Sequence, residues 1–317
     1  MARIGYSLSS EEFGPLKLVD YAKRAEDMGF GFAFISDHFH PWTTRQGHSP
    51  FVWSVIGGIA RATGKLALAT GVTCPLIRMH PAIVAQAAAT SACMMPGRFM
   101  LGLGTGENLN EHITGARWPV STERLRMLKE AIDVIRMLLR GGNHDHHGRY
   151  YTVEDAQLFT LPDEPPPILV ASVGTGSAKL AGECADGLVS TVPNREVVQA
   201  FDSAGGKNKP KYGQLTVCWA RSEEQARRTA LEIWPTAAVS GVTTELPSPW
   251  YFEQVSKEVD EKRIAENVIC GPDPAKHAGA IKEFFEAGFD HVYVHQIGPE
   301  QEGFMQFYNR EILRQFD

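Results

Sequence analysis

Short apolar runs alternate with longer stretches in which apolar residues recur at the 3.6-residue period of a helix. The runs are rich in β-branched and aromatic residues, which favour strands. They predict strands at residues 4–6, 32–35, 66–72, 99–103, 168–172, 188–191, 215–220 and 292–295. Because strands that alternate with helices pair in parallel through right-handed crossovers, the pattern predicts an α/β fold.

The first helical stretch places Leu18, Ala22 and Ala25 on one face and ends at Gly29, a residue that tolerates the left-handed conformation of a helix end. The same order of helix, glycine and strand recurs along the chain. Eight strands favour closure into a (β/α)8 TIM barrel, with an open doubly wound sheet as the alternative. A further short run at 268–272 would add one strand.

Two segments interrupt the alternation and are expected to be loop insertions. Residues 141–165 begin with a polar stretch and continue with an alternating run, which predicts a hairpin. Residues 239–265 contain several prolines and precede the last helices. With 317 residues, of which 43% are hydrophobic, we expect one domain, 1–317, that carries both insertions.

Composition narrows the class of partner. The net charge is −6 and no basic block occurs, which argues against nucleic acid and anionic membranes and favours a small-molecule substrate. The five cysteines are widely spaced and form no CxxC pair, as expected for thiols in a reducing cytoplasm. No leader and no apolar run of about 18 residues is present, so we expect a soluble cytoplasmic protein.

Polar residues follow two of the predicted strands. Asp37, His38, His40 and Trp42 come directly after 32–35, and the glycine-rich loop 104–111 follows 99–103. In a barrel, the loops that follow the strands share one rim, which is where such folds carry active sites. The alternative is a solvated loop whose Pro-Trp pair only packs.

These stretches resemble a known family. The residues concerned are 36–42, the segments 73–75 and 80–86, and 104–107 with 110–111. The sequence is similar to the luciferase-like family, most closely to its branch that uses the 5-deazaflavin coenzyme F420. That branch contains sugar-6-phosphate dehydrogenases and secondary-alcohol dehydrogenases, and the similarity extends over nearly the whole chain.

The resemblance assigns roles to the first polar stretch. It implies that His38 is the general base that takes the proton of a substrate hydroxyl, and that Asp37 contacts the deazaflavin. Trp42 is expected to be a catalytic residue that also walls the substrate pocket. His40 is expected to contact the substrate, because alcohol-oxidising members share this histidine, although a supporting position is equally compatible with the sequence.

The resemblance also implies two catalytic carboxylates. Glu107 would carry a proton between solvent, the cofactor N1 and the substrate, and Asn110 would hydrogen-bond the cofactor. Glu11 matches a further carboxylate of the pocket. A capping box of Ser9 and Glu12 at the following helix explains the residues around Glu11 almost as well.

A third set of residues is expected to bind the cofactor. By resemblance, Gly71 and Val72 form a non-proline cis peptide, with Thr73 beside it, that backs the deazaflavin; an ordinary trans peptide at a β-bulge is the alternative. Backbone N–H groups at a helix start would bind a phosphodiester, which F420 carries. The residues concerned are Gly174, Thr175 and Gly176, with Thr191 contributing a hydroxyl nearby, and a simple turn is the competing interpretation.

The histidine-rich stretch 144–147 raises the question of a metal site. Neighbouring residues in one insertion rarely converge on a single ion, because metal ligands come from separated positions. We therefore expect a solvated hairpin tip and no metal.

The resemblance implies that members oxidising sugar phosphates hold the phosphate with lysines and an arginine, from the loop after the sixth strand and from the late insertion. This chain lacks a lysine in the first of these places. Residues 192–194 read Val-Pro-Asn, and the late insertion offers Gln254 and Asn267, with Lys257 and Lys262 nearby. A buried phosphate without paired cations is costly, so glucose 6-phosphate is disfavoured. A neutral alcohol or another sugar-like substrate is preferred.

The sequence thus predicts an F420-dependent oxidoreductase that transfers hydride between C5 of the deazaflavin and an alcohol or sugar-type substrate. The alternatives are an F420-dependent sugar-6-phosphate dehydrogenase, an FMN-dependent luciferase-like monooxygenase, and a cofactor-carrying or light-emission accessory protein without catalysis. A homodimer is expected.

Overall fold

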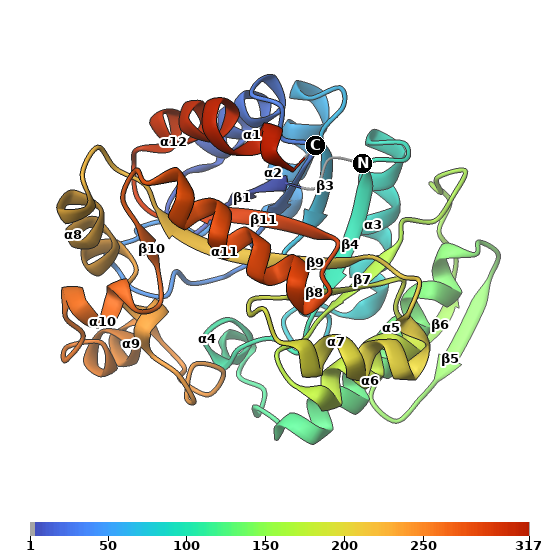
Figure 1. Ribbon diagram of the computed structural model, residues 1–317. Coiled ribbons are helices and arrows are strands. Elements are labelled where there is room, and N and C mark those ends of the chain that lie inside the picture. The colour runs from blue at the N-terminus through green and yellow to red at the C-terminus, as the bar shows by residue number, and fades with distance from the viewer. Residues whose placement is uncertain (1–3, 317) are drawn as a thin grey trace.

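The computed structural model describes residues 4–316, and a closed ring of eight parallel strands forms its centre (Figure 1). The ring strands are β1 (Ile4–Leu8), β2 (Phe32–Ile35), β3 (Ala67–Thr70), β4 (Phe99–Leu103), β7 (Ile168–Ala171), β8 (Gly187–Ser190), β9 (Lys211–Cys218) and β11 (His291–Gln296). Neighbours in this order pair in parallel, and β11 pairs with β1 to close the ring. The predicted TIM barrel is confirmed, and the open sheet is excluded.

All eight predicted strands occur, with one clear difference in length. β9 begins at Lys211, four residues before the predicted start, because Lys211 and Gln214 interrupt the apolar pattern that marked the strand. The run at 268–272 contains a two-residue strand, β10 (Ile269–Cys270), which pairs with the end of β9.

Helices surround the ring and cover its outer face. The long ones are α1 (Pro15–Asp27), α2 (Val52–Ala62), α3 (Pro81–Met94), α5 (Ser121–Leu139), α6 (Thr175–Cys184), α8 (Glu223–Ile233) and α11 (Pro274–Ala287). The shorter ones are α4 (Asn108–Glu111), α7 (Arg195–Phe201), α9 (Pro249–Val255), α10 (Glu261–Ala265) and α12 (Gln301–Phe307). Single turns of 3₁₀ or π type follow at His112–Thr114, Asp202–Gly206, Pro235–Ala238, Tyr308–Ile312 and Leu313–Gln315.

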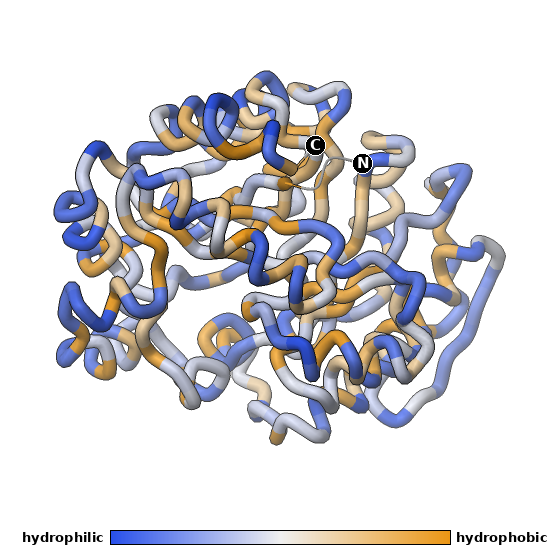
Figure 2. The backbone as a smooth tube through the Cα atoms, viewed as in Figure 1, coloured by the Kyte–Doolittle hydropathy of each residue, from blue (hydrophilic) through white to orange (hydrophobic). Residues whose placement is uncertain are grey.

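The first helix shows why the sequence folds this way. Pro15 occupies its first turn, where the missing N–H costs nothing. Leu18, Ala22 and Ala25 are buried on the face that the periodicity predicted, and Gly29 follows the helix end with a φ of 91°. Figure 2 shows the same division for the whole molecule, with hydrophobic residues concentrated on the strands and inner helix faces.

The interior of the ring is filled by apolar side chains. Phe34 and Tyr293 stack with ring centroids 4.1 Å apart, and Phe32 and Tyr212 pack edge to face beside them. Met100, Leu169 and Val189 belong to the same buried cluster. This layer, which we call the apolar plug, closes the barrel from within, so a ligand has access only at one end.

The two insertions lie on opposite sides of the barrel in Figure 1. The first is an antiparallel hairpin of β5 (His144–His147) and β6 (Thr152–Ala156). The histidines form its first strand rather than its tip, which lies at 148–151, where Glu130 of α5 accepts three backbone N–H groups. The second insertion contributes α9 and α10, and Ile264 of α10 belongs to a small apolar core that also contains Val268.

Two further observations concern the cysteines and the apolar helices. The five cysteines are all free thiols. Among residues 4–316, the longest and most apolar helices still fall short of what a membrane crossing requires.

Candidate active site

A cavity of about 440 Å³ opens above the apolar plug, at the carboxyl ends of the ring strands. Every strand of the ring supplies it with a residue, either from within the strand or from just beyond its end. These residues are Ser7, Ser36, Gly71, Gly104, Ala171, Thr191, Gln214 and His295. The site therefore lies on the rim that the barrel fold predicts.

The strand period explains which residues face the cavity. Side chains two positions apart point the same way, so a lining residue follows a residue of the plug by two positions. His295 follows Tyr293, and Gln214 follows Tyr212 in this manner. The barrel interior thus changes from apolar to small or polar within one step along each strand.

His38 faces the cavity and is paired with Glu11. Its Nε2 lies 3.5 Å from Oε1 of Glu11, and the two side chains are 10% and 3% exposed. Its Nδ1 lies 3.3 Å from the backbone carbonyl of His40. Because a carbonyl can only accept, Nδ1 carries a ring proton, and Nε2 is the nitrogen that lies toward the cavity and Glu11.

Two serine hydroxyls anchor the partner carboxylate. Oε2 of Glu11 accepts from Ser36 at 2.7 Å and from Ser9 at 3.1 Å, which leaves Oε1 for the imidazole. The capping-box alternative is wrong, because α1 begins only at Pro15 and its N-cap is Gly14. Glu11 instead lines the cavity, as the resemblance implied.

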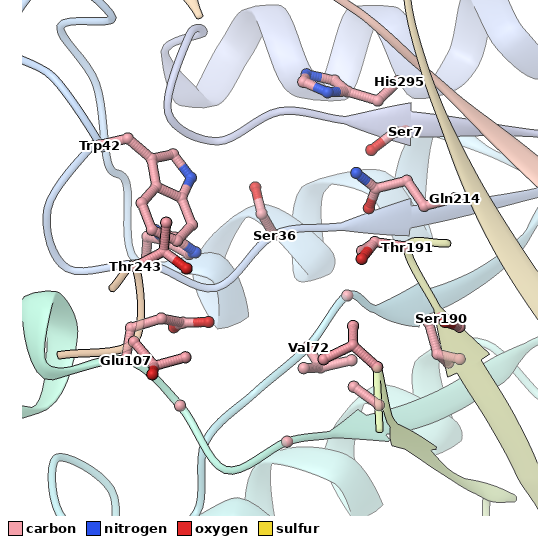
Figure 3. A pocket seen from close by; sticks show the side chains of 18 of the residues that line it. Ser7, Ser36, Trp42, Val72, Glu107, Ser190, Thr191, Gln214, Thr243 and His295 are labelled. Atoms are coloured by element: carbon pink, nitrogen blue, oxygen red, sulfur yellow. The ribbon is translucent and has the colours of Figure 1, made fainter. Parts of the chain in front are cut away.

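Trp42 forms one wall of the cavity. Its ring lies 5.0 Å from the ring of His38 and 5.1 Å from that of Phe252 on α9. Figure 3 shows Trp42 on the same side of the cavity as Thr243 and Glu107. The late insertion therefore reaches the site, while no described residue of the hairpin 141–165 lines it.

Glu107 lines the cavity at the end of the glycine-rich loop and receives a hydrogen bond from Asn110 Nδ2 at 3.3 Å. The amide oxygen of Asn110 accepts the backbone N–H groups of Phe39 and His40 at 2.9 and 3.2 Å. Asn110 is buried and joins the two polar loops behind the cavity. Its predicted cofactor contact stays a prediction.

His40 and Asp37 are placed behind the cavity wall. Nδ1 of His40 lies 2.8 Å from the carbonyl of Leu109, and the ring does not line the cavity. Asp37 is buried, with Oδ2 accepting from Thr73 at 2.7 Å and Oδ1 paired with Arg78 at 2.8 Å. Both acceptor oxygens are thus engaged within the protein, and the predicted ligand contacts of these residues stay predictions.

Arg78 holds a buried network that the sequence did not reveal. It pairs with Asp37 and lies 3.6 Å from Glu111, while its backbone N–H donates to the same glutamate at 2.8 Å. Burial alone would lower the pKa of Arg78, but the neighbouring carboxylates raise it overall. Burial raises the pKa of Glu111, against the pull of Arg78. This network supports both loops that carry the site.

The peptide bond between Gly71 and Val72 is cis, as the resemblance predicted, and both residues line the cavity. The glycine-rich loop packs closely against this segment. A Cβ on Gly104 would come within 2.6 Å of Val72, and a Cβ on Gly106 within 2.5 Å of the Cys74 sulfur. Glycine is required at both positions, and the result is a smooth wall of backbone and Val72 on one side of the cavity.

The start of α6 lies at the same cavity. The helix begins at Thr175, and Ser172 and Ser177 share a hydrogen bond of 2.7 Å beside it. A Cβ on Gly174 or Gly176 would meet no atom within 4 Å. Ser172, Val173 and Ser177 line the cavity here, whereas Gly174, Thr175 and Gly176 do not, and their predicted contact with the cofactor phosphodiester stays a prediction.

Sequence reasoning missed residues that lie within strands rather than in the loops after them. Ser7, Gln214 and His295 line the cavity from β1, β9 and β11, and Trp234 and Thr236 reach it from beyond α8. The signal was present, because a polar residue two positions after a buried aromatic one breaks the apolar run on its inward face.

The charged residues considered for a substrate phosphate lie elsewhere. The late-insertion residues Gln254, Lys257, Lys262 and Asn267 do not line the cavity. Among the described residues, the cavity lining contains no lysine or arginine. No group of three or more potential metal-ligating side chains was found in residues 4–316.

Comparison with known proteins agrees with this geometry. The model of the luciferase-like monooxygenase family matches residues 1–291. An F420-dependent glucose-6-phosphate dehydrogenase of Microbacterium testaceum is 35% identical over 98% of this chain and 96% of its own. The corresponding enzyme of Intrasporangium calvum is 33% identical over 99% and 98%.

Among solved structures, an F420-dependent secondary alcohol dehydrogenase in complex with an F420-acetone adduct superposes with a TM-score of 0.90. It is 29% identical, and the match covers 98% of both chains. The chain therefore belongs to the luciferase-like family, in the branch whose members include F420-dependent dehydrogenases.

Proposed function

We propose that this protein oxidises an uncharged alcohol, in a reversible reaction, with His38 as the general base. It is an F420-dependent oxidoreductase that acts on CH–OH groups, like its relatives. The observation that supports the proposed substrate is the cavity itself: an imidazole–carboxylate pair faces it, and none of its described lining residues is a lysine or arginine.

The residues of the cavity fit coenzyme F420. The smooth wall at Gly71, Val72 and Gly104 suits a flat ring, and the open space at the start of α6 suits a phosphodiester. Thr191, directly after β8, lines the cavity next to the start of α6, which follows the neighbouring strand β7. When bound, F420 supplies a hydride acceptor at C5, and the protein supplies position and proton transfer.

His38 is suited to remove the hydroxyl proton. Its Nδ1 is held by the carbonyl of His40, so the proton arrives at Nε2. The imidazolium that forms lies beside Oε1 of Glu11, which stabilises the positive charge. Glu107, on the same side of the cavity as Trp42, is proposed to exchange the second proton with solvent (Figure 3).

Glucose 6-phosphate is the second candidate substrate, because the similar dehydrogenases of two bacteria are named for it. A dianionic phosphate in this cavity would meet Glu11 and Glu107 without a cationic side chain among the described lining residues. Such a group is costly to bury unpaired. We therefore place an uncharged alcohol first.

The test is a panel of secondary alcohols, free sugars and sugar phosphates, with loss of the absorbance of oxidised F420 as the readout. We expect turnover with uncharged members and at least about tenfold lower kcat/KM with glucose 6-phosphate. A preference for glucose 6-phosphate would overturn the substrate assignment. Tight FMN binding without F420 binding would instead favour a monooxygenase.

We also propose that the protein works as a homodimer in a reducing cytoplasm. Free thiols at all five cysteines support the compartment. Large apolar side chains are exposed at Leu16 on α1, Phe51 before α2 and Ile83 on α3, which supports a subunit contact there. Light scattering during gel filtration measures the mass, and a monomer would contradict the dimer.

A further inference from the structure

A second imidazole–carboxylate pair faces the same cavity from the other side of β1. Nε2 of His295 lies 3.2 Å from Oε1 of Glu12, and both side chains are only 4% exposed. Oε2 of Glu12 accepts the backbone N–H of Gly298 at 2.7 Å. Because this carboxylate accepts at both oxygens, Nε2 carries the ring proton, and Nδ1 of His295 keeps a lone pair.

Three polar side chains near His295 have no hydrogen-bond partner among the described residues. Ser7, Gln214, Thr236 and His295 line this part of the cavity, and we call them the polar flank. The Thr236 hydroxyl is buried and finds no hydrogen-bond partner within residues 4–316. In the same described part of the chain, the side chains of Ser7 and Gln214 also have none. Thr236 is buried, and Ser7 and Gln214 are half-buried with their side chains at the cavity. Polar groups with so little access to solvent normally have a partner, so this unpaired set indicates a ligand.

The polar flank lies across the cavity from the wall assigned to the cofactor. In the ring order, β11 is opposite β4 and β9 is opposite β3, where the glycine-rich loop and Val72 are. Figure 3 shows His295, Ser7 and Gln214 on neighbouring strands, with Val72 on the far side of the space. Trp234 packs against the His295 ring at 4.4 Å and fixes its position. The flank therefore faces a substrate rather than the deazaflavin wall.

We propose that the polar flank binds a second hydroxyl group of the substrate, which makes the substrate an uncharged polyol or free sugar. Nδ1 of His295 accepts this second hydroxyl, while His38 acts on the hydroxyl that is oxidised. This inference rests on the proposed alcohol oxidation and narrows its substrate class. A simple mono-alcohol would leave the flank unpaired, and a phosphate would find no cation in the described lining.

Matched substrate pairs test the proposal with the F420-loaded protein. Cyclohexanol and cyclohexane-1,2-diol differ by one hydroxyl, as do propan-2-ol and propane-1,2-diol. A hydrogen bond to an otherwise unpaired buried group predicts a kcat/KM for each diol that is about tenfold higher than for its mono-alcohol. A ratio at or below one for both pairs would overturn the proposal.

Two substitutions separate a direct contact from a structural role. In His295→Gln the amide replaces Nε2 and keeps the contact with Glu12, but the acceptor at the Nδ1 position is lost. In His295→Asn the amide occupies the Nδ1 position instead. We expect the diol-to-mono-alcohol ratio to fall to about one in His295→Gln and to be partly retained in His295→Asn. His147→Gln, on the exposed strand β5, serves as the control with an unchanged ratio.

Calorimetry keeps this result independent of catalysis. Cyclohexane-1,2-diol is titrated into the F420-loaded His38→Ala variant, with and without His295→Gln. If the diol binds more tightly than cyclohexanol and His295→Gln removes the difference, the polar flank binds the second hydroxyl. If no alcohol is oxidised in the panel while this binding is seen, only the proposed reaction fails. Equal binding of both compounds, or no binding of either, overturns the flank.

Discussion

Two histidine–glutamate pairs flank β1; in both the carboxylate lies at Nε2, and they differ in whether the protein also engages Nδ1. Glu11 and Glu12 are consecutive, yet one pairs with His38 after β2 and the other with His295 on β11, the two neighbours of β1 in the ring. In His38 the carbonyl of His40 engages Nδ1. In His295 the carboxylate of Glu12 engages Nε2.

The difference in partner leads to a difference in role. His38 keeps a basic Nε2 next to a carboxylate that stabilises the proton once it has been taken. His295 donates its Nε2–H to Glu12, and its Nδ1 has no partner among the described residues, so we assign it the role of an acceptor. The same residue types thus give a base on one side of β1 and a binding group on the other.

Removal of the base gives the largest expected effect. His38→Ala should lower kcat about 100- to 10,000-fold, because general base catalysis typically contributes this much. Binding of F420, followed by fluorescence quenching, should stay within about threefold, since His38 is not among the residues proposed to hold the cofactor. The surface substitution His147→Ala is the control.

The reverse result would break the comparison. If His295→Ala abolished turnover while His38→Ala retained it, His295 would be the base, and the assignment of ring protons would be wrong. Measuring kcat and KM separately for both variants with one diol distinguishes the cases, because loss of a binding group is expected chiefly in KM.

The next largest effect is on stability, because a buried ion-pair network supports the loop that carries His38. The loop of His38 lies on the buried Asp37–Arg78–Glu111 network, in which the side chains are at most 8% exposed. Arg78→Met should lower the free energy of unfolding by about 3–5 kcal/mol, since it leaves two buried carboxylates without their cation. Denaturant unfolding measures this change.

An exposed ion pair provides the matched control for Arg78. Arg228 pairs with Glu224 on α8, where the side chains are 60% and 74% exposed. Arg228→Met should change the free energy of unfolding by less than about 0.5 kcal/mol. Equal effects of the two substitutions would show that the buried network does not support the His38 loop.

The sequence revealed the barrel and the two members of one pair, His38 and Glu11, but not that they pair. Parallel strands buried on both faces read as apolar runs between glycines, so the ring could be predicted strand by strand. His38 could be found because it stands in a polar loop after such a run. His295 ends an apolar run and reads as part of a strand, and only pairing with Glu12, 283 positions away, distinguishes it.

The supporting network was equally hidden. Arg78 lies in a loop with no local sign of burial, and its partners come from other segments of the chain. The cofactor wall, in contrast, was predicted by resemblance, and the cis peptide at Gly71–Val72 is present. Local patterns identify loops and strands, whereas the partners that tune a side chain are fixed by long-range packing.

A smaller effect is expected from the carboxylates, and it sharpens the comparison. Glu11→Gln should lower kcat about tenfold, because the imidazolium of His38 then forms beside a neutral amide. Glu12→Gln should chiefly raise KM for a diol, by about fivefold, because the amide holds the His295 ring less firmly. Steady-state kinetics with cyclohexane-1,2-diol measures both, and identical changes in kcat would argue against distinct roles.

The smallest effect concerns a third histidine that has neither a carboxylate partner nor a place at the cavity. His277 on α11 is fully buried, with Nε2 donating to the carbonyl of Gly271 and Nδ1 accepting from the Tyr308 hydroxyl, both at 2.9 Å. Burial lowers the pKa of His277 below its ordinary value of 6.5. The folded protein therefore favours the neutral ring.

The sign of the pH dependence follows from that shift. A histidine with a lowered pKa in the folded state contributes its full stability above the unfolded value of about 6.5 and loses it as the pH falls through the folded value. Urea unfolding at pH 7.5 and pH 5 should show a smaller loss of stability for His277→Gln than for the unsubstituted protein. Other titrating groups are common to both proteins, so their contribution cancels. Parallel curves would mean that His277 takes up its proton in the folded state as easily as in water, and that a buried imidazole here does not need a carboxylate to be charged.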